Sequence, residues 1–222
     1  MVGIEENADD GVACTLDFCD ENDGIVNLAD NDLCGVGETC DVVDGCVGGT
    51  TPAPINLGGF KIKRTSNSSG FFNIPANTLV PVGGYLVISK NATKTNFERA
   101  PNNGWGTLPA GTVYVQGNNI TVINANSNTY ALTRADDTVV DGPTRSTTED
   151  FSYHRSSLTG DVANQWTSRT IELGSPGSGA TITNAASGCY ISEVSDATGT
   201  RGGSTQEFIE IHCTGAVPAA TP

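Results

Sequence analysis

The chain has 222 residues, of which 37% are hydrophobic and only 16% are charged, and its formal net charge is −14. An acidic protein of this kind is repelled by nucleic acid and by anionic membrane surfaces, which excludes both as main partners, whereas cations such as calcium remain candidates. No apolar stretch is long enough to cross a bilayer, and no signal peptide is visible at the N-terminus.

Residues 1–50 form the first predicted unit. They are rich in acidic side chains and contain too few apolar residues for a core, so disulfides or metal must hold them together. Seven cysteines against one methionine in the chain also indicate an oxidising compartment, either extracellular or at the cell surface. Runs such as 10–20 resemble the Asp/Cys repeats of large bacterial surface proteins. The five cysteines of this unit are Cys14, Cys19, Cys34, Cys40 and Cys46.

A cluster of oxygen-bearing side chains in this unit suggests two alternatives. Asp17, Asp20, Asn22 and Asp23 are close enough in sequence to supply the oxygen ligands that calcium needs. The spacing of an EF-hand is absent, and a solvated acidic loop is the simpler alternative. No Cys-x-x-Cys spacing indicates zinc. We therefore expect no cofactor, with calcium as the one exception to test.

Residues 51–184 form the second predicted unit, which begins with the proline-containing linker 50–54 and from residue 55 carries the pattern of an all-β domain. Short apolar runs alternate with turn residues, and no sustained helical period appears. This pattern predicts a β-sandwich of the immunoglobulin-like class. The predicted strands are 59–63, 81–89 with its leading turn, 112–116, 120–123, 130–134 and 138–140.

Residues 185–222 contain a final pair of predicted strands. An antiparallel register that places Cys189 opposite Cys213 also places the isoleucines of the two strands together. We therefore expect a disulfide between these two cysteines, which stabilises by about 3 kcal/mol through loop closure. In the same register Glu193 and Glu210 lie on opposite faces, so they do not form a carboxylate pair.

The final strand pair is marginal alone and needs a partner sheet. The pair docks either in cis, as in a circular permutant, or on a neighbouring molecule by strand addition, which generates a filament if the contact does not close. One cysteine of the seven must also remain outside intramolecular pairs, as a free thiol or an intermolecular bond. The predicted assembly residues of the pair are Tyr190, Ile191, Val194, Phe208, Ile209 and Ile211.

Two segments of the sandwich resemble the lamin-tail domain family. Residues 74–88 match its "Ile-Pro … Pro-Gly-Gly-Tyr-Leu-Val-Ile" signature, and 130–141 match its hairpin ending in Val-Val-Asp, with Asp137 where glycine is common. The segments 151–155 and 166–177, the latter ending in Ser175-Pro-Gly177, are similar to its closing region. The resemblance implies an immunoglobulin-like sandwich used for binding or assembly.

The order of the resembling segments is rotated. The pair at 189–213 looks like the opening strands of a lamin-tail domain, whereas the strand that should follow them lies upstream at 55–60. Such an order implies either a permuted domain or strand exchange between molecules.

The sequence shows no catalytic motif. His154 and His212 lie within predicted strands, and no nucleophile elbow, phosphate-binding loop or metalloprotease helix is present. Three sequons make Asn67, Asn91 and Asn119 candidates for glycosylation.

We therefore expect a non-catalytic extracellular structural protein that forms a homo-oligomer or a surface filament through strand addition and disulfides. The alternative is a calcium-supported module of a larger secreted protein that binds glycan or a surface protein. An enzyme is the third hypothesis. Neither nucleic acid nor membrane insertion is expected.

Overall fold

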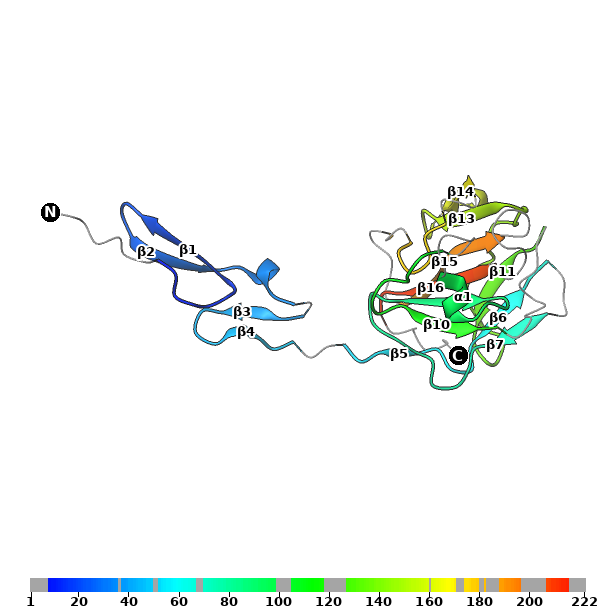
Figure 1. Cartoon of the computed structure of the whole chain (residues 1–222), viewed down its shortest axis with the longest axis horizontal. Helices are drawn as coiled ribbons and strands as arrows, with labels where there is room; N and C mark the ends of the chain where they lie inside the picture. Colours follow the sequence, from blue (N-terminus) through cyan, green and yellow to red (C-terminus); the bar gives the residue numbers. More distant parts are fainter. Residues whose placement is uncertain are drawn as a thin grey trace. The chain divides into compact units, whose positions relative to one another are not determined.

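The computed structural model of the chain is nearly all-β, with short helical turns between the strands (Figure 1). Contacts divide the chain into two compact units, Met1–Ala53 and Pro54–Pro222. The structure describes residues 8–35, 37–49, 52–66, 70–98, 105–117, 127–159, 161–170, 174–179, 182, 188–196 and 207–215.

The first unit consists of two hairpins. In each of them an aspartate begins the turn and a glycine in the left-handed conformation ends it, which is the chemistry that tight turns require. Both strand pairs are antiparallel. The elements are β1 (Thr15–Asp20), β2 (Gly24–Ala29), the 3₁₀ turn η1 (Asn31–Leu33), β3 (Thr39–Asp41) and β4 (Gly45–Val47).

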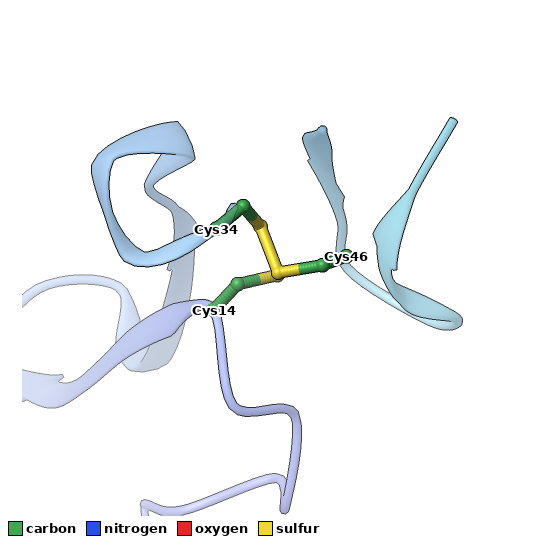
Figure 2. Close-up of side chains that lie close together, drawn as sticks. All are labelled: Cys14, Cys34 and Cys46. Carbon is green, nitrogen blue, oxygen red and sulfur yellow. A yellow bond between two sulfur atoms is a disulfide. The ribbon is translucent and has the colours of Figure 1, made fainter. Parts of the chain in front are cut away.

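Two disulfides hold these hairpins together. Cys14 is bonded to Cys40, and Cys34 is bonded to Cys46. The sulfur atoms of Cys14, Cys34 and Cys46 lie within 4.8 Å of one another, so the two bonds are adjacent (Figure 2). Among the described residues of this unit, Cys14 alone is a buried apolar side chain. The unit therefore depends on covalent bonds where larger domains depend on a core.

The second unit contains a six-stranded sheet in the order β10-β9-β16-β15-β13-β14. Neighbouring strands are antiparallel except β9 and β10, which are parallel. The two strands nearest the C-terminus therefore occupy the middle of this sheet (Figure 1). Its strands are β9 (Tyr85–Ser89), β10 (Val113–Gln116), β13 (Phe151–Arg155), β14 (Trp166–Thr170), β15 (Cys189–Asp196) and β16 (Phe208–Cys213).

A four-stranded sheet in the order β12-β11-β6-β7 shares one hydrophobic core with the six-stranded sheet. Ile62 and Leu132 enter this core from the smaller sheet, and Ile88, Ile191 and Ile209 enter it from the larger one. The remaining elements are β5 (Ile55–Asn56), β6 (Lys61–Arg64), β7 (Phe71–Asn73), β8 (Leu79–Val80), α1 (Lys94–Glu98), β11 (Tyr130–Thr133), β12 (Val139–Asp141) and η2 (Val162–Gln165).

The helix α1 belongs to a second apolar cluster and was not expected from the sequence. Phe97 of this helix packs on Phe208 of β16 with ring centroids 5.6 Å apart, and Trp105 contacts the same ring at 5.1 Å. This cluster lies on the face of β16 that points away from the main core, because Phe208 and Ile209 are consecutive residues of one strand. The predicted strand at 120–123 lies outside the described residues.

The register of β15 and β16 differs from the predicted one in its second half. Cys189 lies opposite Cys213 and Ile191 opposite Ile211, as predicted, but the register shifts between Ile191 and Glu193. Ser192 is the extra residue of this β-bulge, so Glu193 lies directly opposite Glu210. The prediction that the two glutamates occupy opposite faces is therefore wrong. Val194 correspondingly joins the main core, where the predicted alternation had placed Glu193.

Asp141 links the two sheets at the bulge. Its Oδ1 accepts a hydrogen bond from Arg155 Nη2 at 2.9 Å, and its Oδ2 accepts one from the Ile191 backbone N–H at 2.9 Å. The guanidinium of Arg155 also lies over the Trp166 ring, 4.8 Å from its centroid. Both charged side chains are largely buried, so each depends on the other for compensation.

Replacing Asp141 with alanine is expected to lower the free energy of unfolding by about 3 kcal/mol, because a buried guanidinium loses its partner. Urea unfolding followed by tryptophan fluorescence measures this change. Asp136→Ala, in the exposed turn between β11 and β12, is the control and should change the free energy of unfolding much less. Equal losses in the two variants would contradict the role given to Asp141.

Candidate functional site

Two fully buried carboxylates face each other on the outer face of the six-stranded sheet. Glu193 comes from β15 and Glu210 from β16, and the bulge at Ser192 brings them to the same face. We refer to these two residues as the glutamate pair. Buried acids are rare unless they are hydrogen-bonded, so the partners of this pair define what the site does.

The partners of the glutamate pair come from neighbouring strands and from one loop. Ser152 of β13 donates its hydroxyl to Glu193 Oε1, and Ser192 donates its hydroxyl to Glu210 Oε1 at 2.6 Å. Residues 174–179, which we call the covering loop, supply backbone donors. Ser175 N–H donates to Glu193 Oε2 at 3.1 Å, and Gly177 N–H donates to Glu210 Oε2. The pair therefore fixes the covering loop onto the sheet.

Glycine is required where the covering loop approaches the pair. Gly177 has φ +81°, and a Cβ there would lie 2.6 Å from the Thr112 hydroxyl oxygen. A Cβ on Gly179 would lie 2.6 Å from Glu210 Oε1, and Tyr85 donates its hydroxyl to the Gly179 carbonyl at 2.8 Å. The Gly-Ser-Pro-Gly-Ser-Gly composition thus allows the backbone to reach the buried acids.

Burial raises the pKa of both glutamates. The pKa of Glu193 rises to about 7, against the opposing effect of hydrogen bonds from Ser152 and Ser175. The pKa of Glu210 rises to about 8, first because of burial and second because of the neighbouring Glu193 charge. Near neutral pH the pair therefore holds at least one proton, because two adjacent buried charges repel each other.

Ser175, His154 and Glu193 form a serine–histidine–carboxylate group of the kind found in acyl-transfer triads. Ser175 Oγ lies 3.4 Å from His154 Nδ1, and His154 Nε2 lies 3.5 Å from Glu193 Oε1. However, Ser175 Oγ also donates directly to Glu193 Oε2 at 3.2 Å, so the carboxylate competes for the serine that a triad would leave to histidine. His154 is buried, as are the two acids. These contacts form a hydrogen-bond network that holds the covering loop against the sheet.

His212 lies on the same outer face and takes part in a separate stack. Its ring lies 4.4 Å from Tyr85, and Tyr190 Oη is 2.9 Å from its Nδ1. Burial lowers the pKa of His212. Both histidines are thus buried sheet residues.

The six predicted assembly residues are all buried in the sheet of their own chain. The strand pair that carries them docks in cis, between β9 and β13. Cys189 and Cys213 form a disulfide across the pair, with Cα atoms 4.1 Å apart. Among the seven cysteines, only Cys19 is unbonded, and its side chain is exposed.

Among the described residues, the carboxylates of the predicted calcium ligands Asp17, Asp20 and Asp23 do not come together as one group. Asp20 Oδ1 instead accepts the N–H groups of Asn22 and Asp23 at 2.8 and 3.1 Å, which lowers the Asp20 pKa. Asp17 lies close to Asp9 and Asp10, with one carboxylate oxygen from each within 4.8 Å of the others.

Of the three sequons, only Asn91 lies within the described residues. It is exposed and lies two residues after the end of β9. Asn67 and Asn119 lie outside the described residues.

The sequence did not identify the glutamate pair, its serine partners or the covering loop as one site. Two signals were available in the sequence. A glutamate stands between apolar residues in each of the two final strands, Glu193 before Val194 and Glu210 between two isoleucines, and the Ser175–Gly177 segment is similar to the closing region of the lamin-tail domain family.

Comparison of the chain with family models, with curated proteins and with solved structures gives no match. Within the described residues, no helix is both long enough and apolar enough to span a membrane.

Proposed function

We propose that this chain is a non-catalytic extracellular structural protein that assembles with copies of itself into a surface filament or array. The observation that carries this proposal is the exposed apolar surface of the first unit. Leu16, Phe18 and Leu28 are about half exposed, and Val43 is 78% exposed. Exposed apolar groups in a unit with so little core are typical of surfaces that bind a partner.

The disulfides support the extracellular part of the proposal. Three bonds join six of the seven cysteines, and bonds of this kind persist in oxidising compartments. The terminal strand pair is paired within its own sheet, so it does not supply strand addition in this arrangement. Strand addition would instead use the outer edges of the six-stranded sheet, at β10 and β14.

We also propose that the second unit is a lamin-tail-like sandwich in rotated strand order. Two sheets around one core support this likeness. A further support is Asp137, which occupies the position where the family commonly has glycine and has φ +70°. Such a backbone conformation favours glycine and is tolerated by aspartate.

The proposal predicts that the purified full chain forms high-mass species as its concentration rises under oxidising conditions. Light scattering after size exclusion and negative-stain imaging measure this, and we expect regular arrays or filaments. A chain that stays monomeric at every concentration, with or without reductant, would contradict the proposal.

The second candidate function is a calcium-supported module that binds glycan or a surface protein. The proximity of Asp9, Asp10 and Asp17 favours this alternative. Calorimetry with calcium and a glycan panel separates the two functions, because saturable sugar binding by a monomer would favour the module. Clear turnover in a hydrolase screen would contradict both.

A further inference from the structure

The two hairpins of the first unit are copies of one structural unit. The first hairpin, β1–β2, contains Cys19-Asp-Glu-Asn-Asp-Gly-Ile-Val26, and the second hairpin, β3–β4, contains Cys40-Asp-Val-Val-Asp-Gly-Cys-Val47. The two segments have the same length and share cysteine, aspartate, glycine and valine at matching positions. Cys19 therefore corresponds to Cys40.

The geometry of the two hairpins agrees with this correspondence. Asp20 Oδ1 accepts two backbone N–H groups of its turn at 2.8 and 3.1 Å, and Asp41 Oδ1 accepts two at 2.8 and 3.0 Å. Gly24 and Gly45 both have φ 78°. In the strand register, Cys40 lies opposite Cys46 in the second hairpin, and Cys19 lies opposite Ile25 in the first. Ile25 therefore stands at the position of Cys46.

The second hairpin shows what a cysteine at this position does. Cys40 is bonded to Cys14, which lies outside its own hairpin and 26 residues upstream. Cys46, across the strand pair, is likewise bonded outside its hairpin, to Cys34. The equivalent position in the first hairpin carries the exposed thiol of Cys19. In this repeat, the position therefore makes a disulfide to a segment beyond the hairpin.

The environment of Cys19 also suits a protein partner. Ile25 lies directly opposite Cys19, so both side chains are on one face of the hairpin. Ile25 is 45% exposed, so the thiol stands beside an accessible apolar group. The other six cysteines are already bonded to one another, so a second copy of this chain can offer only its own Cys19 without breaking a bond.

We propose that the Cys19–Ile25 face of the first hairpin is a self-association site, at which two copies of this chain form a Cys19–Cys19 disulfide around packed Ile25 side chains. The proposal rests on the proposed function and names the contact that self-assembly uses. A contact of one patch with itself is a two-fold, closed contact, so it makes dimers. Longer arrays require a further contact, such as the sheet edges.

The bond forms by thiol–disulfide exchange with a low-molecular-weight disulfide such as oxidised glutathione. The Cys19 thiolate of one copy attacks this disulfide and releases one glutathione thiol, which leaves a mixed disulfide. The Cys19 thiolate of the second copy then attacks the Cys19 sulfur of the mixed disulfide and releases the second glutathione thiol. The two protons from the cysteines end on the two glutathione molecules, and the oxidised glutathione is reduced.

The test incubates the full-length chain in a buffer of oxidised and reduced glutathione. Non-reducing electrophoresis and intact mass measurement quantify the covalent dimer, and peptide mapping identifies its bond. We expect a dimer bonded at Cys19, and no covalent dimer for Cys19→Ser. A product that stops at the glutathione mixed disulfide, or a dimer bonded through other cysteines, would overturn the proposal.

The apolar part of the face has its own variant. Ile25→Ser should slow dimer formation by about fivefold, because the packing of about 1 kcal/mol is lost. Val42→Ser, at 49% exposure in the turn of the second hairpin, is the matched control and should leave the rate unchanged. Maleimide labelling of Cys19 should be equal in the two variants. Equal dimerisation rates in the two variants would show that the disulfide forms by random collision of thiols. They would overturn the proposal that Ile25 belongs to a docking face.

The fate of Cys19→Ser separates this inference from the proposed function. One result is that the parent chain forms no disulfide dimer while both it and Cys19→Ser form high-mass assemblies. This result would overturn the inference and leave the proposed function standing. A parent chain that is monomeric in oxidant and in reductant would overturn both.

Discussion

A chain that lacks residues 189–222 is expected to lose the fold of its second unit completely. The deletion removes β15 and β16, the two middle strands of the six-stranded sheet. Besides the two bonded cysteines, six apolar side chains of this pair are buried, and each contributes about 2 kcal/mol. Their sum, about 12 kcal/mol, is comparable to the whole stability of a typical domain.

Circular dichroism and amide NMR spectra of the truncated chain measure this loss. A chain that ends at Gly215 is the control, since it keeps every strand and hydrogen bond described above. Its spectra should match those of the full chain. A folded second unit in the truncated chain would show that the sheet forms without β15 and β16. It would favour strand exchange between molecules over docking of the pair in cis.

The second unit is expected to become less stable as the pH rises through 7 and 8. The folded pKa values of Glu193 and Glu210, about 7 and about 8, lie above the ordinary value of 4.5. The unfolded chain therefore ionises first, and the stability that the protonated pair contributes is complete below pH 4.5 and is lost as the pH passes the folded values. Between pH 6.5 and 8.5 the expected loss from the two glutamates is about 3 kcal/mol.

His212 acts in the opposite direction, at lower pH. Burial lowers its folded pKa below 6.5, so protonation destabilises the fold as the pH falls below that value. The window from pH 6.5 to 8.5 therefore isolates the glutamates. Urea unfolding at several pH values in this window measures the slope.

Replacing Glu210 with glutamine should flatten this pH dependence. Glutamine keeps the shape and the acceptor oxygen of the protonated acid and removes the charge that Glu193 opposes. Glu149→Gln, an exposed position in the same unit, is the control and should keep the parental slope. A stability that is flat or rising over the window in the parent chain would contradict the assignment of the buried pair.

The sequence predicted the class of fold and one register because both depend on local pattern. Alternating apolar residues indicated strands, and the isoleucines of the final pair fixed which residues face each other near Cys189 and Cys213. The bulge was missed because the prediction assumed strict alternation. In β15 the core residues Ile191 and Val194 are three apart, whereas their partners Ile209 and Ile211 are two apart. This mismatch between the strands is the sequence signal of an inserted residue.

Other features depended on contacts that local pattern does not encode. The pairing of β16 with β9 joins residues more than a hundred positions apart, and the cysteine connectivity of the first unit had several equivalent solutions. The candidate site was missed as a direct result of the register. Once Glu193 was placed on the wrong face, nothing connected it with Glu210 or with the loop that covers both.

The position of β15 and β16 in the sheet has a consequence for biosynthesis. These strands follow all the other described strands along the chain, yet β9 and β13 on either side pair with them. The sheet therefore cannot form during synthesis until β16 has left the ribosome. A chain that has emerged only as far as β14 leaves β9 and β13 with unpaired edges, and such edges favour aggregation and chaperone binding.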